Sequence, residues 1–217
     1  RATHLRQELT RSPAFRMGSI AEVPGFVAWI ARHYGPIRQA AESTSRHARL
    51  LRIDPHPIQE WVILDFAYDT GNAAGQNMVT LATQAACDYI RAERGCPYLI
   101  ESGFNSDKKP SHRSLMAGRG HSVAVEFDLP DRVMASLGVT GESVLEFQSL
   151  AMTAAQAAGL LGNNLHLANG LTAIYLATGQ DAACVAENAL AFTTASPAPS
   201  GDGLVVRITM PSLTVGT

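Results

Sequence analysis

The first half of the chain alternates between the apolar patterns of helices and of strands. Apolar positions three and four residues apart predict helices over residues 22–34, 36–51 and 76–92. Alternation over 61–68 predicts a strand, and a short strand is expected over 98–101. The prolines of 54–57 are interpreted as a break between elements. This order of elements predicts a small α+β unit over about residues 14–99.

The second half carries a different pattern. Alternation predicts a strand over 122–129, followed by a short helix over 131–137. An alanine-rich helical region over 151–178 is expected to break near Gly162, and a further helix runs from Gly179 to about 189. Residues 191–195 and 204–210 predict a hairpin through the glycine-rich turn at 200–203.

Composition excludes several classes of protein. With 217 residues, 17% charged residues and a net charge of −2, the chain has no basic excess for nucleic acid. Polar residues such as Gln156 and Asn163 within 150–178 argue against a lipid-facing helix, so no membrane partner is expected. Three cysteines without a CxxC motif are typical of reduced thiols in a cytoplasmic protein, with neither a disulfide framework nor a zinc site.

The chain has only two lysines, the neighbours Lys108 and Lys109, whereas the other 15 of its 17 basic residues are arginine. A lysine is a compact charge that can give up a proton, and an arginine stays charged, so the two are not interchangeable. The lysine pair in its Gly/Asn/Ser-rich loop is therefore the first candidate for chemistry. The alternative is a solvated loop in which the lysines are incidental.

Three further features could serve chemistry or structure alone. A glycine loop with Gly71 and Gly75, between a strand and a helix, could cradle a phosphate; a tight turn without ligand is the alternative. Arg46 could supply an anion clamp, and a solvated helix face is the alternative for it. His166 and Asn169 are expected on one helix face with Gly162, although a lone histidine there is more often structural. Asp181 near a helix start is either a cap or, if it lies close to Lys108, the partner of that lysine.

Several runs together resemble the hydroxymethylglutaryl-CoA (HMG-CoA) reductase family in collinear order. STSRHARL, DTGNAAGQNMV, SGFNSDKKP, GRGHS, HLANGLTAIYLATGQDAA and TMPSLTVGT are similar to that family's runs, as is LTRSP to its TRGP run. The DKKP run and the long run ending in GQDAA are the specific ones. The family reduces a CoA thioester to an alcohol with two NADPH and without a metal, in isoprenoid precursor synthesis by the mevalonate pathway.

The resemblance implies roles for individual residues. Lys108 would stabilise the oxyanion and Asp181 would tune that lysine. Substrate would be bound by Arg11, Ser102, Asn105, Asp107, Lys109, His166 and Asn169. NADPH would be bound by Ser45, Arg46, His47, Asn72, Ala73, Gly75, Gln76, Asn77 and Met78, with Arg46 on the 2′-phosphate.

The resemblance also implies an architecture. An α+β fold is expected, with a large HMG-CoA-binding and dimerising domain (1–13 and 100–217) and an inserted ferredoxin-like NADPH-binding domain (14–99). A homo-oligomer, dimer or higher, with its active site at the subunit interface and a cytoplasmic location are expected as well.

The departures from the family pattern leave alternatives open. Asn72 stands where the family has Asp, Gln76 where it has Met, and a family lysine expected near 149–151 is absent. The chain begins at Arg1 and is interpreted as a fragment, with the family's catalytic glutamate upstream and its histidine downstream, so the chain by itself is expected to be inactive. A divergent reductase of another acyl-CoA, or a non-catalytic nucleotide- or CoA-binding dimerisation module, are the rival hypotheses.

Overall fold

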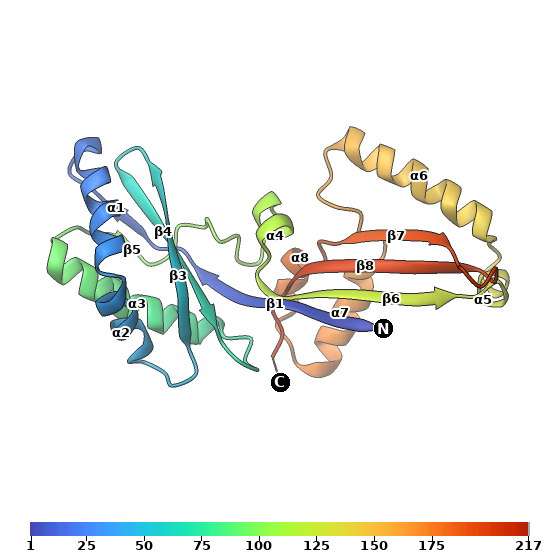
Figure 1. Cartoon of the computed structure of the whole chain (residues 1–217), viewed down its shortest axis with the longest axis horizontal. Coiled ribbons are helices and arrows are strands. Elements are labelled where there is room, and N and C mark those ends of the chain that lie inside the picture. Colours follow the sequence, from blue (N-terminus) through green and yellow to red (C-terminus); the bar gives the residue numbers. More distant parts are fainter. Residues whose placement is uncertain (217) are drawn as a thin grey trace. The chain divides into compact units, whose positions relative to one another are not determined.

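The chain forms two compact units in a computed structural model that describes residues 1–216. The flanking unit consists of Arg1–Arg6 and Lys108–Thr214. The inserted unit consists of Gln7–Asp107 together with Val215 and Gly216. The first strand, β1 (Ala2–Arg11), contributes its start to the flanking unit and its end to the inserted unit. Both units combine helices with antiparallel strands, which confirms the predicted α+β class (Figure 1).

The inserted unit has the βαββαβ order of a ferredoxin-like fold. Its elements in chain order are β2 (Ala14–Arg16), the short helix η1 (Ile20–Glu22), α1 (Val23–Arg32), α2 (Tyr34–Glu42), β3 (Arg49–Ile58), β4 (Trp61–Asp69), α3 (Gln76–Arg94) and β5 (Tyr98–Leu99). The strands follow the order β5-β2-β4-β3, and every pair is antiparallel. The end of β1 continues the line of β2 along β4.

The core of the inserted unit explains its patterns. β4 is central, so its residues from Val62 to Tyr68 are all buried, and the helices pack Phe26, Ile30 and Ala82 against them. The predicted strand over 61–68 and helix over 76–92 are confirmed. The division into an NADPH-binding domain and an HMG-CoA-binding domain stays a prediction.

Two predictions in this unit are wrong. The second helix ends at Glu42 and not near residue 51, and the proline-rich run is part of β3 and not a break. Within residues 1–216, β3 pairs with β4 alone, so it is an edge strand with one side open. Pro55 and Pro57 are two residues apart and face the same way, and an edge strand tolerates a missing N–H on its open side.

The flanking unit is built on a sheet with the strand order β1-β6-β8-β7. Besides β1 it contains α4 (His112–Ala117), β6 (Gly120–Leu129), α5 (Asp131–Ser136), α6 (Gly141–Ala158), α7 (Leu167–Thr178), the short helix η2 (Ala182–Cys184), α8 (Val185–Asn188), β7 (Phe192–Pro197) and β8 (Leu204–Leu213). The predicted hairpin of β7 and β8 and the break in the alanine-rich region are confirmed. β1 and α4 were not predicted.

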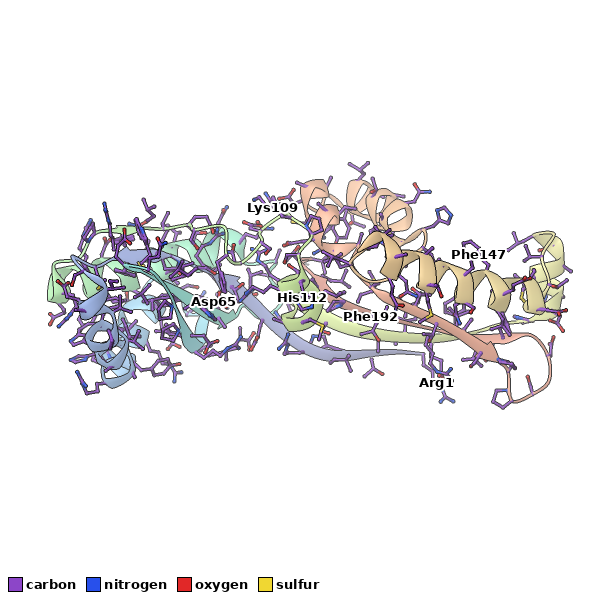
Figure 2. The ribbon with its side chains drawn as sticks, turned by 90° about the horizontal axis from the view of Figure 1, so that it is seen from above. Arg1, Asp65, Lys109, His112, Phe147 and Phe192 are labelled. Carbon is purple, nitrogen blue, oxygen red and sulfur yellow. The ribbon has the colours of Figure 1, made fainter. Side chains whose placement is uncertain are left out.

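Helix α6 runs alongside β7, and among residues 1–216 none of its side chains is fully buried (Figure 1). Phe147 and Leu150 are 58% and 65% exposed, and Phe147 projects from α6 in Figure 2. Among residues 1–216, no helix combines the length and the apolar character needed to cross a membrane. The three cysteines, all within the described residues, are free and buried.

Candidate functional site

The ammonium group of Lys108 and the carboxylate of Asp181 form an ion pair in the flanking unit. Lys108 Nζ lies 2.7 Å from Asp181 Oδ2, and the side chains are 40% and 43% exposed. This contact is the proximity that the hypothesis for Lys108 requires. The hydrogen bond from Lys108 lowers the pKa of Asp181, and the backbone N–H of Ala183 adds to that effect.

Asp181 has a second, structural task. Its carboxylate accepts a hydrogen bond of 3.0 Å from the N–H of Ala183 and caps η2. Both interpretations of Asp181, cap and lysine partner, therefore hold at once. Capping fixes the carboxylate before any ligand binds, since one oxygen is tied to the backbone of its own helix.

The backbone of Lys108 is held by a residue that the sequence did not single out. The N–H of Lys108 donates to Glu187 Oε2 over 3.2 Å, and Lys108 has a left-handed φ of 59°. Glu187 Oε1 in turn pairs with Arg119 Nη1 at 2.7 Å, and both side chains are fully buried. In the sequence, Glu187 follows an alanine-rich segment and looks like a solvated residue, so nothing there indicates its role. The GRGHS run is a sequence signal for Arg119, and it does not extend to Glu187.

In the inserted unit, Arg11 lies at the centre of an acidic pair. Its Nη1 contacts Glu101 Oε2, and its Nη2 is 3.6 Å from Asp107 Oδ2. Arg11 is buried, and its Nε atom has no hydrogen-bond partner within residues 1–216. Arg11 is therefore surrounded by charged residues, and its Nε–H donor remains without an acceptor among residues 1–216.

The other predicted substrate residues of the inserted unit shape the loop that precedes Lys108. Ser102 donates through its hydroxyl to Ser12 O at 2.6 Å. Asn105 is fully buried, and its amide donates to Thr10 O at 3.1 Å. Contact of Ser102 or Asn105 with substrate stays a prediction. Lys109, in the flanking unit, is exposed on the loop before α4 (Figure 2).

The predicted cofactor residues gather at one end of the β3–β4 hairpin. Arg49 of β3 is paired with Asp69 of β4, so the loop with Ser45, Arg46 and His47 and the glycine loop after Asp69 emerge together. Arg46, His47, Asn72 and Asn77 are exposed, while Ser45, Ala73, Gly75, Gln76 and Met78 are partly buried. Loops that emerge together, one with a basic side chain, can bind an anionic ligand.

Gly75 starts the 19-residue helix α3 with a left-handed φ of 80°. A Cβ atom there would lie 2.5 Å from Thr70 Cγ2, so only glycine fits. Thr70 in turn donates through its hydroxyl to Ala73 O at 2.8 Å and closes the loop. The loop conformation is thus specified by Thr70 and Gly75 together.

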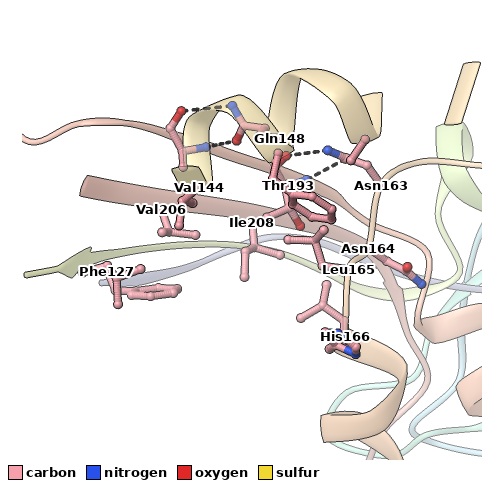
Figure 3. A pocket seen from close by; sticks show the side chains of 15 residues that line it. Phe127, Val144, Gln148, Asn163, Asn164, Leu165, His166, Thr193, Val206 and Ile208 are labelled. Atoms are coloured by element: carbon pink, nitrogen blue, oxygen red, sulfur yellow. Dashed lines mark hydrogen bonds between the residues drawn. The ribbon is translucent and has the colours of Figure 1, made fainter. Parts of the chain in front are cut away.

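His166 and Asn169 lie at the start of α7, both exposed, but not as predicted with Gly162 on one helix face. α7 begins at Leu167, so His166 is its N-cap residue and Gly162 lies in the preceding turn. Asn163 anchors this turn, since its amide group both donates to Thr193 O (2.6 Å) and accepts from Thr193 N (2.8 Å) (Figure 3).

His166 borders an apolar cavity of about 420 Å³ between α6 and the strands of the flanking unit (Figure 3). Phe127, Val144, Leu165, Val206 and Ile208 line the cavity as well. Neither Lys108 nor Asp181 lines it. Its walls suit an apolar occupant and lack charged groups for a phosphate.

Comparison with known proteins decides the family. The family model described as hydroxymethylglutaryl-coenzyme A reductase matches residues 1–217. The chain belongs to the hydroxymethylglutaryl-coenzyme A reductase family. It is 40% identical to the 3-hydroxy-3-methylglutaryl-coenzyme A reductase of Haloferax volcanii, over 98% of this chain and 53% of that protein. The corresponding protein of Methanothermobacter thermautotrophicus is 38% identical over 96% of this chain and 53% of its own length.

The chain thus spans about half the length of the curated relatives it matches. Among solved structures, the class II 3-hydroxy-3-methylglutaryl-CoA reductase of Streptococcus pneumoniae bound to NADPH is similar with a TM-score of 0.71. That match covers 100% of this chain and 60% of the other, at 18% identity. The likeness shows a shared reductase-family fold.

Proposed function

We propose that this chain contributes the oxyanion-stabilising part of an NADPH-dependent reductase that converts HMG-CoA to mevalonate. The observation that carries this proposal is the 2.7 Å pair between Lys108 and Asp181 in a chain of the reductase family. Hydride addition to a thioester carbonyl places negative charge on its oxygen. A positioned ammonium group stabilises that charge in the transition state.

Within this proposal, Asp181 keeps the lysine charged and oriented. An opposite charge within hydrogen-bond distance favours the protonated amine. Because both side chains are about two-fifths exposed, a substrate oxygen can approach Lys108 from solvent. Lys108 then donates to the oxygen while Asp181 holds the same ammonium group.

The residues around Arg11 would bind the acidic acyl part of the substrate. Arg11, Ser102, Asn105, Asp107 and Lys109 are proposed for this role, with His166 and Asn169 near the thioester. The planar fork of an arginine suits a carboxylate, and the contacts of Arg11 with the carboxylates of Glu101 and Asp107 support the assignment.

NADPH is proposed to bind at the end of the β3–β4 hairpin in the inserted unit. Ser45, Arg46 and His47 would hold the 2′-phosphate, and the loop from Asn72 to Met78 would follow the rest of the cofactor. The common end of the two loops and the exposed Arg46 support this assignment. A phosphate suits the fork of an arginine. The Streptococcus pneumoniae structure bound to NADPH supports the choice of cofactor.

One observation favours a second candidate, a reductase of another acyl-CoA. Ser149 lies exposed on α6 near where the family pattern has a lysine. An enzyme without that charge would make one fewer contact with an anionic substrate.

Oligomeric state and location belong to the same proposal. A homo-oligomer with the site at its subunit interface is supported by exposed apolar side chains on α6 and α7, such as Leu150, Ile174 and Leu176. A cytoplasmic location is supported by three free, buried cysteines.

The test is an assay of the whole protein that carries this sequence, with HMG-CoA, NADPH and mass spectrometry of the product. Mevalonate formed with two NADPH oxidised per product supports the proposal. Turnover of a different acyl-CoA with none of HMG-CoA favours the second candidate. NADPH binding without turnover of any acyl-CoA would instead support the hypothesis of a non-catalytic binding module.

A further inference from the structure

A fully buried ion pair lies next to the backbone of Lys108. Arg119 and Glu187 have no exposed side-chain surface, and Arg119 Nη1 is 2.7 Å from Glu187 Oε1. The Thr214 hydroxyl lies 3.1 Å from the same carboxylate oxygen and 2.9 Å from Asn188 Oδ1, so its one proton is shared between these two acceptors. Charges are rarely buried without a reason, because desolvation opposes the gain from pairing.

The second oxygen of Glu187 reaches Lys108. Glu187 Oε2 accepts a hydrogen bond of 3.2 Å from the Lys108 N–H. Lys108 has a φ of 59°, in the left-handed region that residues other than glycine rarely adopt. Such a conformation persists where the surroundings hold it. The hydrogen bond from Glu187 is one of the contacts that hold it.

The short segment from Asp181 to Glu187 therefore contacts both the ammonium group and the backbone N–H of Lys108. Asp181, which caps η2, pairs with the ammonium group, and Glu187, on the next helix α8, accepts from the backbone. The position of the Nζ atom depends on the backbone as much as on the side-chain partner. The spacing of Asp181 and Glu187 along this segment thus fixes both the backbone and the ammonium group of Lys108.

The local sequence around Arg119 explains how it becomes buried. Gly118 and Gly120 have left-handed φ angles of 73° and 86°, and a Cβ on either would lie within 2.4 Å of a carbonyl oxygen of β8. The two glycines let this turn press against Pro211 and Leu213, and the arginine between them is enclosed. Arg119 thereby pairs with the buried carboxylate that accepts from the backbone of the lysine.

We propose that Glu187 and Arg119 are positioning residues, which fix the backbone of Lys108 so that its ammonium group meets both Asp181 and the developing substrate oxyanion. This inference rests on the proposed function of Lys108. A purely structural ion pair would stabilise the fold without affecting the chemical step.

The decisive variant replaces both charges together. Replacement of a buried ion pair by apolar residues of similar size often leaves a protein folded, whereas removal of one partner does not. We therefore expect the double variant Arg119→Met/Glu187→Met of the whole protein to fold and to bind NADPH normally. Its kcat should fall roughly 10- to 100-fold, with little change in KM, because a catalytic group displaced by about 1 Å loses rate of this order.

The matched control is Tyr175→Phe. The Tyr175 hydroxyl donates to Asn188 Oδ1 at 2.6 Å, so the variant removes a buried hydrogen bond from the neighbouring residue of Glu187 without contacting Lys108. Its kcat should stay within about 2-fold of the unmutated enzyme. If the double variant does not fold, Thr214→Val removes the hydroxyl shared between Glu187 and Asn188, and Tyr175→Phe controls for the lost contact to Asn188. A kcat loss of a few-fold at constant KM is expected for Thr214→Val alone.

A second measurement follows Lys108 directly. The chain has only two lysines, so with selective ¹³C labelling of lysine it contributes only two Cε signals, and Lys109 serves as an internal reference. We expect the Lys108 signal to shift in the double variant and the Lys109 signal to stay. An unchanged kcat and an unshifted Lys108 signal in the folded double variant, or wild-type kcat in Thr214→Val where the double variant does not fold, would overturn the inference.

Lys108→Ala, assayed in parallel, distinguishes a failure of the positioning role of Glu187 and Arg119 from a failure of the proposed role of Lys108. If Lys108→Ala is inactive while the double variant is fully active, only the positioning role is wrong. If Lys108→Ala is active, the proposed role of Lys108 fails and the inference fails with it.

Discussion

Lys108 and Asp181 are 73 positions apart in the sequence, yet their charged groups lie 2.7 Å apart. Asp181 is also held by its own helix, through the N–H of Ala183. The lysine therefore meets a carboxylate that is already fixed. This arrangement can keep an ammonium group oriented toward a substrate without a large loss of side-chain freedom on binding.

The two lysines should respond differently to substitution in the whole protein. Lys108→Ala should lower kcat by about 10²–10³, as expected for the loss of one oxyanion donor, with a much smaller change in KM. Lys109→Ala should mainly raise KM, because its proposed partner is a substrate carboxylate present in ground and transition states alike. Steady-state kinetics of both variants measures this, and wild-type values for both would support the solvated-loop interpretation.

Lys108→Arg should not restore activity. An arginine fork cannot occupy the place of a compact ammonium group, although it keeps the charge. The comparison of kcat for Lys108→Arg and Lys108→Ala tests geometry apart from charge. Recovery of most of the activity by arginine would show that only a positive charge is needed at residue 108.

The titration of Asp181 should depend on Lys108. The hydrogen bond from Lys108 lowers the pKa of Asp181, so Lys108→Met should raise that pKa toward its usual value. A lowered carboxylate pKa contributes stability that is present above the unfolded-state pKa and is lost as the pH falls through the folded-state pKa. The stabilising effect of the pair should thus begin to weaken below about pH 4 and be lost as the pH falls through the lowered pKa of Asp181. Carboxyl ¹³C NMR of both proteins gives the two pKa values, and equal values would contradict the pairing in solution.

The sequence pattern predicts an element correctly where burial of the whole element, or of one of its faces, sets the spacing of its apolar residues. β4 is buried along nearly its whole length, and α3 has one buried face, so both were predicted correctly. β1 is largely polar and is exposed over its first half, and its place is set by pairing with other strands, so no apolar periodicity marks it. The prolines of β3 suggested a break, because the sequence does not show that this strand lies at an edge.

The candidate site shows the same division. Lys108 and Asp181 were found from residue type and from the family resemblance, which carry chemistry directly. Glu187 and Arg119 were not assigned a role, because their significance lies in a buried contact 68 residues apart in sequence. Burial of a charged pair is a property of the folded chain, and residue type alone favours a solvated position for both.

Arg46 should set the preference for NADPH over NADH. A charge-assisted contact to a phosphate contributes about 1.5–3 kcal/mol, so Arg46→Ala in the whole protein should erode the preference roughly 10-fold or more. Arg32→Ala is the matched control, since Arg32 is an exposed arginine of the same unit at the end of α1. The ratio of kcat/KM for the two cofactors measures the effect. A preference equally strong in Arg46→Ala and in Arg32→Ala would place the 2′-phosphate elsewhere.

The glycine loop should tolerate a methyl group at Gly71 far better than at Gly75. Both glycines have left-handed φ angles, 60° and 80°, so alanine at either position costs about 1–2 kcal/mol of backbone strain. At Gly71 no atom lies within 4 Å of the added Cβ, whereas at Gly75 the Cβ would be 2.5 Å from Thr70 Cγ2. Gly75→Ala should therefore lose a further 1–3 kcal/mol or so through overpacking.

The same pair of variants tests the loop as a cofactor site. Chemical denaturation gives the free energies of unfolding, and fluorescence titration with NADPH gives the binding constants. If the loop holds NADPH, Gly75→Ala should weaken binding even under conditions in which the protein stays folded, because the displaced start of α3 no longer presents its N–H groups at the same place. Gly71→Ala should bind NADPH nearly as well as the unmutated chain. Equal NADPH affinity of both variants, despite a clear difference in stability, would mean that the conformation of this loop does not matter for the cofactor.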